Sequence, residues 1–195
     1  MVKHLSPIYQ KFYFFGILIL IVCCLTLNQS CSSKDSINPE NKINSIILLQ
    51  YDSAGINLIG QYKAIKYSTN SIPVTLDTIK LVANKTYLFK ALLLYTDSVT
   101  KTSTDYTNQI WNLRDQHNLI FFPTTTVANL NVTYLDKDSK DFPVGLTTRW
   151  KATIPSSILI LTDLRHLPIA KTAIPSVNQD LEQSDFNVKF PTIIR

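Results

Sequence analysis

Short runs of β-branched and aromatic residues recur through most of this chain and restrict the folds that it can adopt. They occupy residues 46–51, 58–67, 74–81, 86–95, 119–122, 127–135, 146–154, 158–164 and 186–194. Apolar and polar residues alternate over 186–190, as in a strand with one face on a core and the other in water. The pattern predicts an all-β fold, an antiparallel β-sandwich of the immunoglobulin-like type.

One segment has a helical rhythm instead. Within residues 104–117, Tyr106, Ile110 and Leu113 fall on one side of a short helix, and Thr104 or Asp105 is a suitable N-cap. We expect a turn or two of helix here, crossing the end of the sandwich. Residues 45–195 are sufficient for one core without disulfides. Two smaller sandwiches that meet near residues 124–126 are the alternative.

The first thirty residues have the layout of a secretory signal peptide. Lys3 and Lys11 precede residues 12–27, which carry no charge, and a cationic end followed by an apolar segment directs export. A membrane-spanning helix needs about 20 apolar residues. We therefore expect residues 1–30 to be removed, with a retained N-terminal anchor as the alternative.

Cys31 would then be the only thiol of the mature chain, because Cys23 and Cys24 lie in the leader. Residues 27–31, Leu-Asn-Gln-Ser-Cys, resemble a bacterial lipobox, in which the cysteine becomes N-terminal and carries lipid such as palmitate. This predicts a lipidated Cys31 followed by a polar, flexible tether over residues 31–44. A free or intermolecularly paired cysteine is the alternative.

The composition excludes several classes of function. Four glycines in all cannot supply a dinucleotide-binding fingerprint or a P-loop. Basic residues are scattered singly, so the sequence gives no reason to expect nucleic acid as a partner. Neither a G-x-S-x-G motif nor a zinc-protease motif occurs. We expect a non-enzymatic protein with no catalytic residues and no cofactor, although folding can bring aspartates together for hydrolysis.

The densest acidic cluster lies between two predicted strands. Asp136, Asp138 and Asp141 resemble the start of a calcium loop, but the glycine and glutamate of an EF-hand are missing at the required positions. A solvated turn is the favoured interpretation, and a weak calcium site of another design is the alternative.

Four further side chains are candidates for contact with a ligand. Trp111 and Trp150 could offer flat rings on which a sugar stacks, and the alternative is packing in the core. His117 and His166 are 49 residues apart and show none of the usual zinc-site spacings. We expect each histidine to form hydrogen bonds at a strand end.

A pattern of Asp followed by a hydroxyl residue and then a small or aliphatic residue occurs at Ser36, Ser53, Thr78 and Ser98. It is similar to the acceptor motif for periplasmic O-glycosylation in the Bacteroidota, which predicts sugars on these four residues. The alternative is the ordinary role of Asp in turns.

A series of landmarks resembles, in its order, a group of uncharacterised small lipoproteins of the Bacteroidota. The landmarks are residues 86–87, 115–121, 134–138, 143–146, 164–171 and 184–190. Members of this group often carry computer-assigned names that suggest a periplasmic binding domain of sugar transport. The resemblance implies a cell-envelope lipoprotein of the outer membrane without an established activity. Lys34 and Asp35, shortly after Cys31, suggest display at the cell surface.

Together these features predict a lipid-anchored β-sandwich of the outer membrane that binds an extracellular glycan or a partner protein. Loops serve as contact surfaces on a strand scaffold, and the candidate loops are residues 115–117, 136–145 and 166–171. An accessory structural subunit of an envelope complex, held by pairing of strand edges, is the alternative. A hydrolase ranks third.

Overall fold

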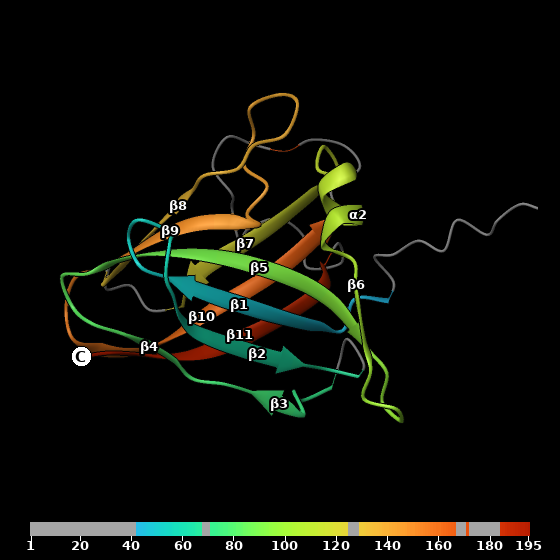
Figure 1. Ribbon diagram of the computed structural model, residues 1–195, viewed down its shortest axis with the longest axis horizontal. Coiled ribbons are helices and arrows are strands. Elements are labelled where there is room, and N and C mark those ends of the chain that lie inside the picture. Colours follow the sequence, from blue (N-terminus) through green and yellow to red (C-terminus); the bar gives the residue numbers. More distant parts are fainter. Residues whose placement is uncertain (1–41, 68–70, 125–128, 167–170, 172–183) are drawn as a thin grey trace, which may run out of the picture. The chain divides into compact units, whose positions relative to one another are not determined.

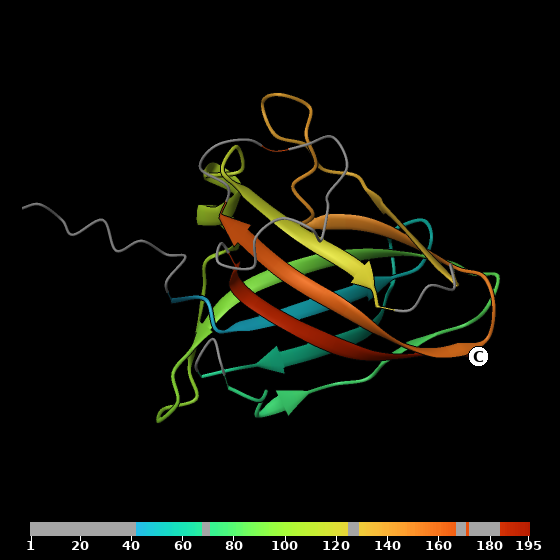
Figure 2. The same cartoon turned by 180° about the vertical axis from the view of Figure 1, so that it is seen from behind.

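Two β-sheets stack face to face around a common core (Figures 1 and 2). The computed structural model describes residues 42–67, 71–124, 129–166, 171 and 184–195, all within the structural unit Asn38–Arg195. The predicted signal peptide, Cys31 with most of its tether, and Ser36 lie outside the described residues. No helix among the described residues is long and apolar enough to cross a membrane.

The larger sheet has seven strands in the order β3-β2-β1-β5-β9-β8, with β6 paired to β5. Its strands are β1 (Ser45–Tyr51), β2 (Leu58–Ile65), β3 (Thr75–Leu76), β5 (Thr86–Thr96), β6 (Ser103–Asp105), β8 (Leu130–Tyr134) and β9 (Thr147–Ala152). All of its pairings are antiparallel.

The smaller sheet has four strands in the order β4-β11-β10-β7. These are β4 (Ile79–Leu81), β7 (His117–Pro123), β10 (Ser156–His166) and β11 (Ser184–Ile194), and a helix of six residues, α2 (Thr107–Asn112), precedes β7. The pairing of β4 with β11 is parallel, whereas the other two are antiparallel. In both sheets, a strand that precedes residues 124–126 pairs with a strand that follows them. These pairs are β5 with β9 in the larger sheet and β7 with β10 in the smaller one.

The predicted all-β sandwich with one short helix is confirmed in the described part of the chain, while its immunoglobulin-like type stays a prediction. The single strand predicted over residues 74–81 is wrong, because β3 and β4 lie in different sheets. Asp77 stands at the break, where its carboxylate accepts the N–H of Lys63 at 2.7 Å. Strand β6 escaped prediction because its three residues are polar and exposed.

Trp150 fills the middle of the core. Its ring centroid lies 4.2 Å from that of Phe89 and 5.3 Å from that of Phe121, and its indole N–H donates to Thr148 Oγ1 at 2.8 Å. The side chain is 0% exposed. The candidate role of Trp150 as a ligand contact is therefore wrong, because the ring is enclosed between the two sheets.

Two tyrosine hydroxyls of the larger sheet accept backbone N–H groups at the two edges of the smaller sheet. Tyr134 accepts the N–H of Phe121 at 2.9 Å, and Tyr87 accepts the N–H of Val82, just after β4, at 2.9 Å. Burial raises the pKa of Tyr134 to about 12, so this hydroxyl stays protonated and neutral. These bonds satisfy edge N–H groups that would otherwise invite pairing with another chain.

Helix α2 begins at Thr107, so the predicted N-cap at Thr104 or Asp105 is wrong. Tyr106 occupies the N-cap position, and the carboxylate of Asp105 accepts the N–H of Thr107 at 2.8 Å. Ile110 is buried beneath the helix, as its spacing predicts, whereas Leu113 is exposed. The short helix leaves Trp111 on its outer side.

Candidate functional site

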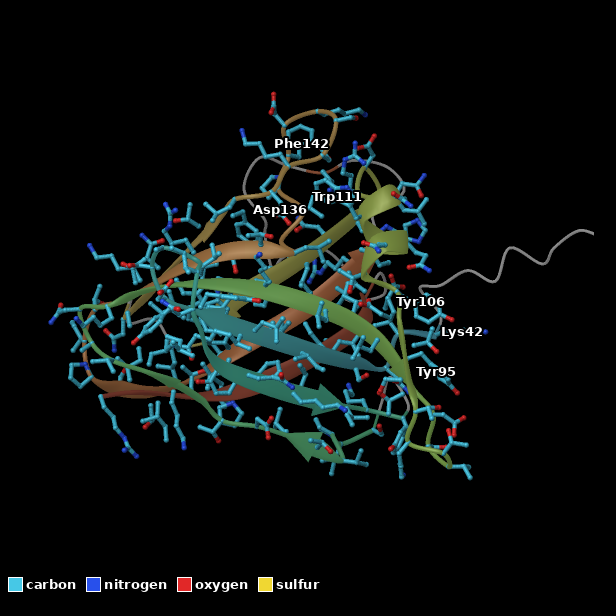
Figure 3. The ribbon with its side chains drawn as sticks, viewed as in Figure 1. Lys42, Tyr95, Tyr106, Trp111, Asp136 and Phe142 are labelled. Carbon is cyan, nitrogen blue, oxygen red and sulfur yellow. The ribbon has the colours of Figure 1, made fainter. Side chains whose placement is uncertain are left out.

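The turn after α2 and the loop between β8 and β9 lie side by side at one end of the sandwich (Figures 1 and 3), and Lys171 joins them. The carboxylate of Asp115 accepts the N–H of Ser139 at 3.0 Å and its O–H at 2.7 Å. These bonds join the turn after α2 to the loop between β8 and β9. They also lower the pKa of Asp115, so the carboxylate stays ionised in neutral solution.

Lys171 adds a buried connection at the same end. Its ammonium group donates to the carbonyl oxygens of Arg114 and Pro143 and lies 3.2 Å from Asp138 Oδ2. The side chains of Lys171 and Asp138 are each 1% exposed. Burial lowers the pKa of Lys171, and Asp138 opposes that shift. The described residues of the three predicted binding loops thus form one connected end.

Two acids of the predicted calcium loop accept hydrogen bonds from backbone N–H groups in and next to the loop. Asp136 accepts the N–H groups of Gly145 and Thr147, each at 2.8 Å, and burial raises its pKa despite these donors. Asp138 Oδ1 accepts two further N–H groups of its own loop, while Asp141 is exposed beside Lys137. Within the described residues these three acids do not gather as a set of metal ligands. The loop is a turn, as the favoured interpretation has it, but it is not solvated throughout, because Asp138 is buried and only Asp141 of the three acids is exposed.

Gly145 fixes how closely this loop approaches β7. Its φ is +95°, and a Cβ atom placed on it would lie 2.0 Å from the carbonyl oxygen of Leu119. Only glycine accepts both the positive φ and this contact with backbone. The N–H of Leu119 donates to the carbonyl oxygen of Val144 at 2.7 Å, so the loop is hydrogen-bonded to the strand.

His117 and His166 lie side by side at this end although 49 residues separate them. They are directly opposite each other in the register of β7 with β10, and their rings stack with centroids 5.0 Å apart at 27°. Asp185, near the start of β11, completes a cluster in which the ligand atoms of all three side chains lie within 4.8 Å of one another. His117 is buried, and the other two are half-buried.

The topology of the smaller sheet explains this convergence. Strands β11, β10 and β7 are adjacent and antiparallel, so the start of β11, the end of β10 and the start of β7 meet at one edge of the sheet. Each of the three side chains occupies such a strand end. Hydrogen bonding of His117 at a strand end is observed as predicted: its Nδ1 lies 2.9 Å from the carbonyl oxygen of Leu113.

Trp111 projects from α2 at the same end (Figure 3). Its side chain is 39% exposed, and the guanidinium carbon of Arg114 lies 4.9 Å from its ring centroid. Trp111 therefore remains a candidate for contact with a ligand, whereas the alternative of core packing does not hold for it.

The candidate glycosylation sites occupy connections between strands. Ser53 and Ser98 are exposed, and Thr78 is half-buried between β3 and β4. The preceding Asp52 and Asp97 accept backbone N–H groups of their own turns, from Ile56 at 2.9 Å and from Thr100 at 2.7 Å, and these bonds lower their pKa values. Turn chemistry therefore accounts for these aspartates, and O-glycosylation stays a prediction.

Sequence reasoning included Lys171 in a candidate loop without giving it a role, and it missed Asp185 as part of this end. Both belong to the landmark segments, but neither has a partner nearby in the sequence that would mark it. No known protein family matches the chain, and neither does any curated protein or solved structure.

Proposed function

We propose that this protein is a lipid-anchored, non-enzymatic component of the outer membrane that binds an extracellular glycan at the end carrying α2. The observation that carries the proposal is the exposed indole of Trp111 at the end whose loops are held by the buried Lys171–Asp138 ion pair and by the exposed Asp115–Ser139 hydrogen bonds. Sugar sites in proteins combine a flat aromatic ring with a few fixed polar groups.

The indole is held in a defined position. Ile110 packs in the core directly beneath α2, and Arg114 stacks over the indole while donating to the carbonyl oxygen of Trp111 at 3.3 Å. A guanidinium over an aromatic face is an attractive cation–π contact. A ring with few alternative orientations loses little entropy when a ligand stacks on it.

Fixed hydrogen-bonding groups lie at the same end of the sandwich as the indole. Asp115 follows α2 closely, and its lowered pKa keeps the carboxylate an acceptor. Ser139, to which it is bonded, is exposed on the neighbouring loop. Carboxylates and hydroxyls of this kind match the hydroxyl groups of a sugar.

A glycan-binding assay tests this proposal. The full chain is applied to an array of bacterial and host polysaccharides, together with Trp111→Ala and the control Phe122→Ala, which removes an exposed aromatic ring further along β7. We expect the Trp111 variant alone to bind about tenfold more weakly, which corresponds to about 1.4 kcal/mol. Equal losses in both variants, or no glycan bound by the parent chain, would refute it.

The membrane anchor has its own test. Mass spectrometry of the protein extracted from native membranes is expected to show an acylated N-terminal Cys31. An intact Met1, or an unmodified Cys31, would contradict the anchor. The same peptides report whether Ser36, Ser53, Thr78 and Ser98 carry sugars.

The edge of β2 favours the second candidate, an accessory subunit held by strand pairing. In the described residues, β3 covers only Ala64 and Ile65 of this edge, and Leu58 and Ile59 near its start are more than half exposed. Photo-crosslinking from position 59 in intact cells, compared with position 159 on β10, tests this candidate. A protein adduct specific to position 59 supports it, and identical patterns from the two positions contradict it.

A further inference from the structure

The cluster of His117, His166 and Asp185 has the composition and the placement of a metal centre. We infer that these three side chains bind one divalent transition-metal ion, zinc above the others, at the end of the smaller sheet. The inference does not depend on glycan binding, because none of the three residues is among the groups proposed to contact the glycan, which are Trp111, Asp115 and Ser139.

The separations suit one small ion. Tetrahedral zinc with bonds of about 2.0–2.1 Å to nitrogen and oxygen holds its ligand atoms about 3.3 Å apart. The ligand atoms of the cluster lie within 4.8 Å of one another, so rotations of the side chains suffice to close the remaining distance. The backbone already supplies the arrangement, because the two histidines face each other across paired strands.

The hydrogen bond of His117 prepares one nitrogen for a metal. A backbone carbonyl only accepts, so the contact with the carbonyl oxygen of Leu113 places the proton of the neutral ring on Nδ1. Nε2 then carries the lone pair and is the nitrogen able to coordinate. A metal-binding histidine whose other ring nitrogen donates to a carbonyl is the usual arrangement around such ions.

The ligand types select among metals. Two imidazoles with one carboxylate favour zinc and its first-row neighbours, whereas calcium and magnesium prefer sites made of oxygen atoms alone. Three protein ligands also leave a fourth tetrahedral position for water or an external ligand. His166 and Asp185 are half-buried, so part of the cluster reaches solvent, which gives an ion a route of entry.

A neighbouring cation does not oppose this assignment. Arg165 precedes His166, but strand alternation directs it to the other face of β10. There its Nε lies 2.7 Å from Asp163 Oδ2, and this carboxylate balances its charge.

Cobalt spectroscopy of the full chain, purified in detergent and stripped with a chelator, tests the inference. We expect one equivalent of Co²⁺ to produce the visible absorption of a tetrahedral site, and zinc to displace it while calcium does not. His166→Gln and Asp185→Asn are each expected to lower cobalt affinity about 100-fold, the effect of losing one of three ligands. Near-UV circular dichroism verifies that each variant is folded.

Asp141→Asn is the matched control, because it makes the same chemical change in the neighbouring acidic loop. Asparagine tolerates the φ of +66° at this position as aspartate does, so we expect unchanged cobalt affinity. An absent cobalt spectrum, folded ligand variants that bind like the parent, or a loss confined to Asp141→Asn would each overturn the assignment. Loss of glycan binding in Trp111→Ala with an intact cobalt spectrum would show that the two sites are separate.

Discussion

The two faces of β10 carry polar clusters of opposite character at the same end of the strand. On the inner face, Ile160 and Leu164 pack in the core, and His166 follows them at the same two-residue spacing. On the outer face, Asp163 and Arg165 form a salt bridge whose side chains are both 0% exposed. The outer cluster balances a cation with an anion, whereas the inner one gathers three metal-ligand groups.

A β-bulge assigns two neighbouring residues of β11 to different clusters. Arg165 lies opposite Ser184 and Leu164 opposite Phe186, so Asp185 is an extra residue in the ladder. Ser184 donates to Asp163 Oδ1 at 2.6 Å on the outer face, while Asp185 joins the histidines. One inserted residue thus separates a structural group from a candidate ligand.

The comparison teaches that burial alone does not identify function. A buried pair whose charges cancel is weak evidence for a site, because structural networks have this form throughout proteins. Metal-ligand side chains that come from different strands and converge on one point are stronger evidence for a site.

The largest effect is expected from Arg165→Met in the outer cluster. Removing the cation leaves the buried Asp163 uncompensated, which costs about 3–5 kcal/mol of unfolding free energy. Urea unfolding followed by tryptophan fluorescence measures the loss. Arg149→Met, at an exposed position of β9, is the control and is expected to change little. A loss of less than about 1 kcal/mol for Arg165→Met would mean that the outer cluster is not structural.

Zinc is expected to stabilise the parent chain through the inner cluster. A ligand that binds only the folded state adds about 2.7 kcal/mol at 100 times its dissociation constant. Thermal unfolding with zinc and with a chelator measures this difference. His166→Gln removes a ligand and is expected to abolish it, and an equal zinc response from both proteins would contradict the distinction between the clusters.

Two serine-to-alanine substitutions compare a partly buried and an exposed serine–carboxylate bond of nearly equal length. Ser184→Ala removes the donor of Asp163, for which a buried unsatisfied acceptor costs about 1–3 kcal/mol. Ser139→Ala removes the donor of Asp115, an exposed carboxylate that water can solvate. We expect urea unfolding to show a clearly larger loss for Ser184→Ala. The reverse order would contradict the assignment of a structural role to the outer cluster.

The smallest effect is the pH dependence of Ser139→Ala. Ser139 lowers the pKa of Asp115 from 3.8, and an acid whose pKa is lowered on folding stabilises the protein above its unfolded value. That contribution disappears as the pH falls through the lowered pKa. The variant should therefore be less stable than the parent at neutral pH and equal to it in strong acid, as measured by urea unfolding at both pH values. A difference that persists unchanged in acid would contradict this origin.

Much of the fold could be predicted from alternation within strands. Strand β11 shows it clearly, because Phe186, Val188 and Phe190 face the core as their spacing predicts. The split of β3 from β4 could not be predicted, because apolar residues continue on both sides of Asp77 and only tertiary pairing moves the chain between sheets.

The site was less accessible to prediction than the fold. His117 and His166 were recognisable as candidates, but their proximity depends on the register of two strands far apart in the sequence. Asp185 depends on a bulge, and a one-residue slip in a ladder reverses the face of every side chain beyond it. Such information lies in pairing rather than in local composition.

The central claim is that the bulge in β11 gives Asp185 to a zinc site and leaves Ser184 bonded to Asp163. Crystals of the full chain grown with zinc test it most directly, by diffraction measured on both sides of the zinc absorption edge. The account predicts one anomalous peak among His117 Nε2, His166 and Asp185, with the Ser184–Asp163 bond intact on the outer face. A peak at Asp136–Asp141 instead, or no bound zinc at the histidines, would contradict it.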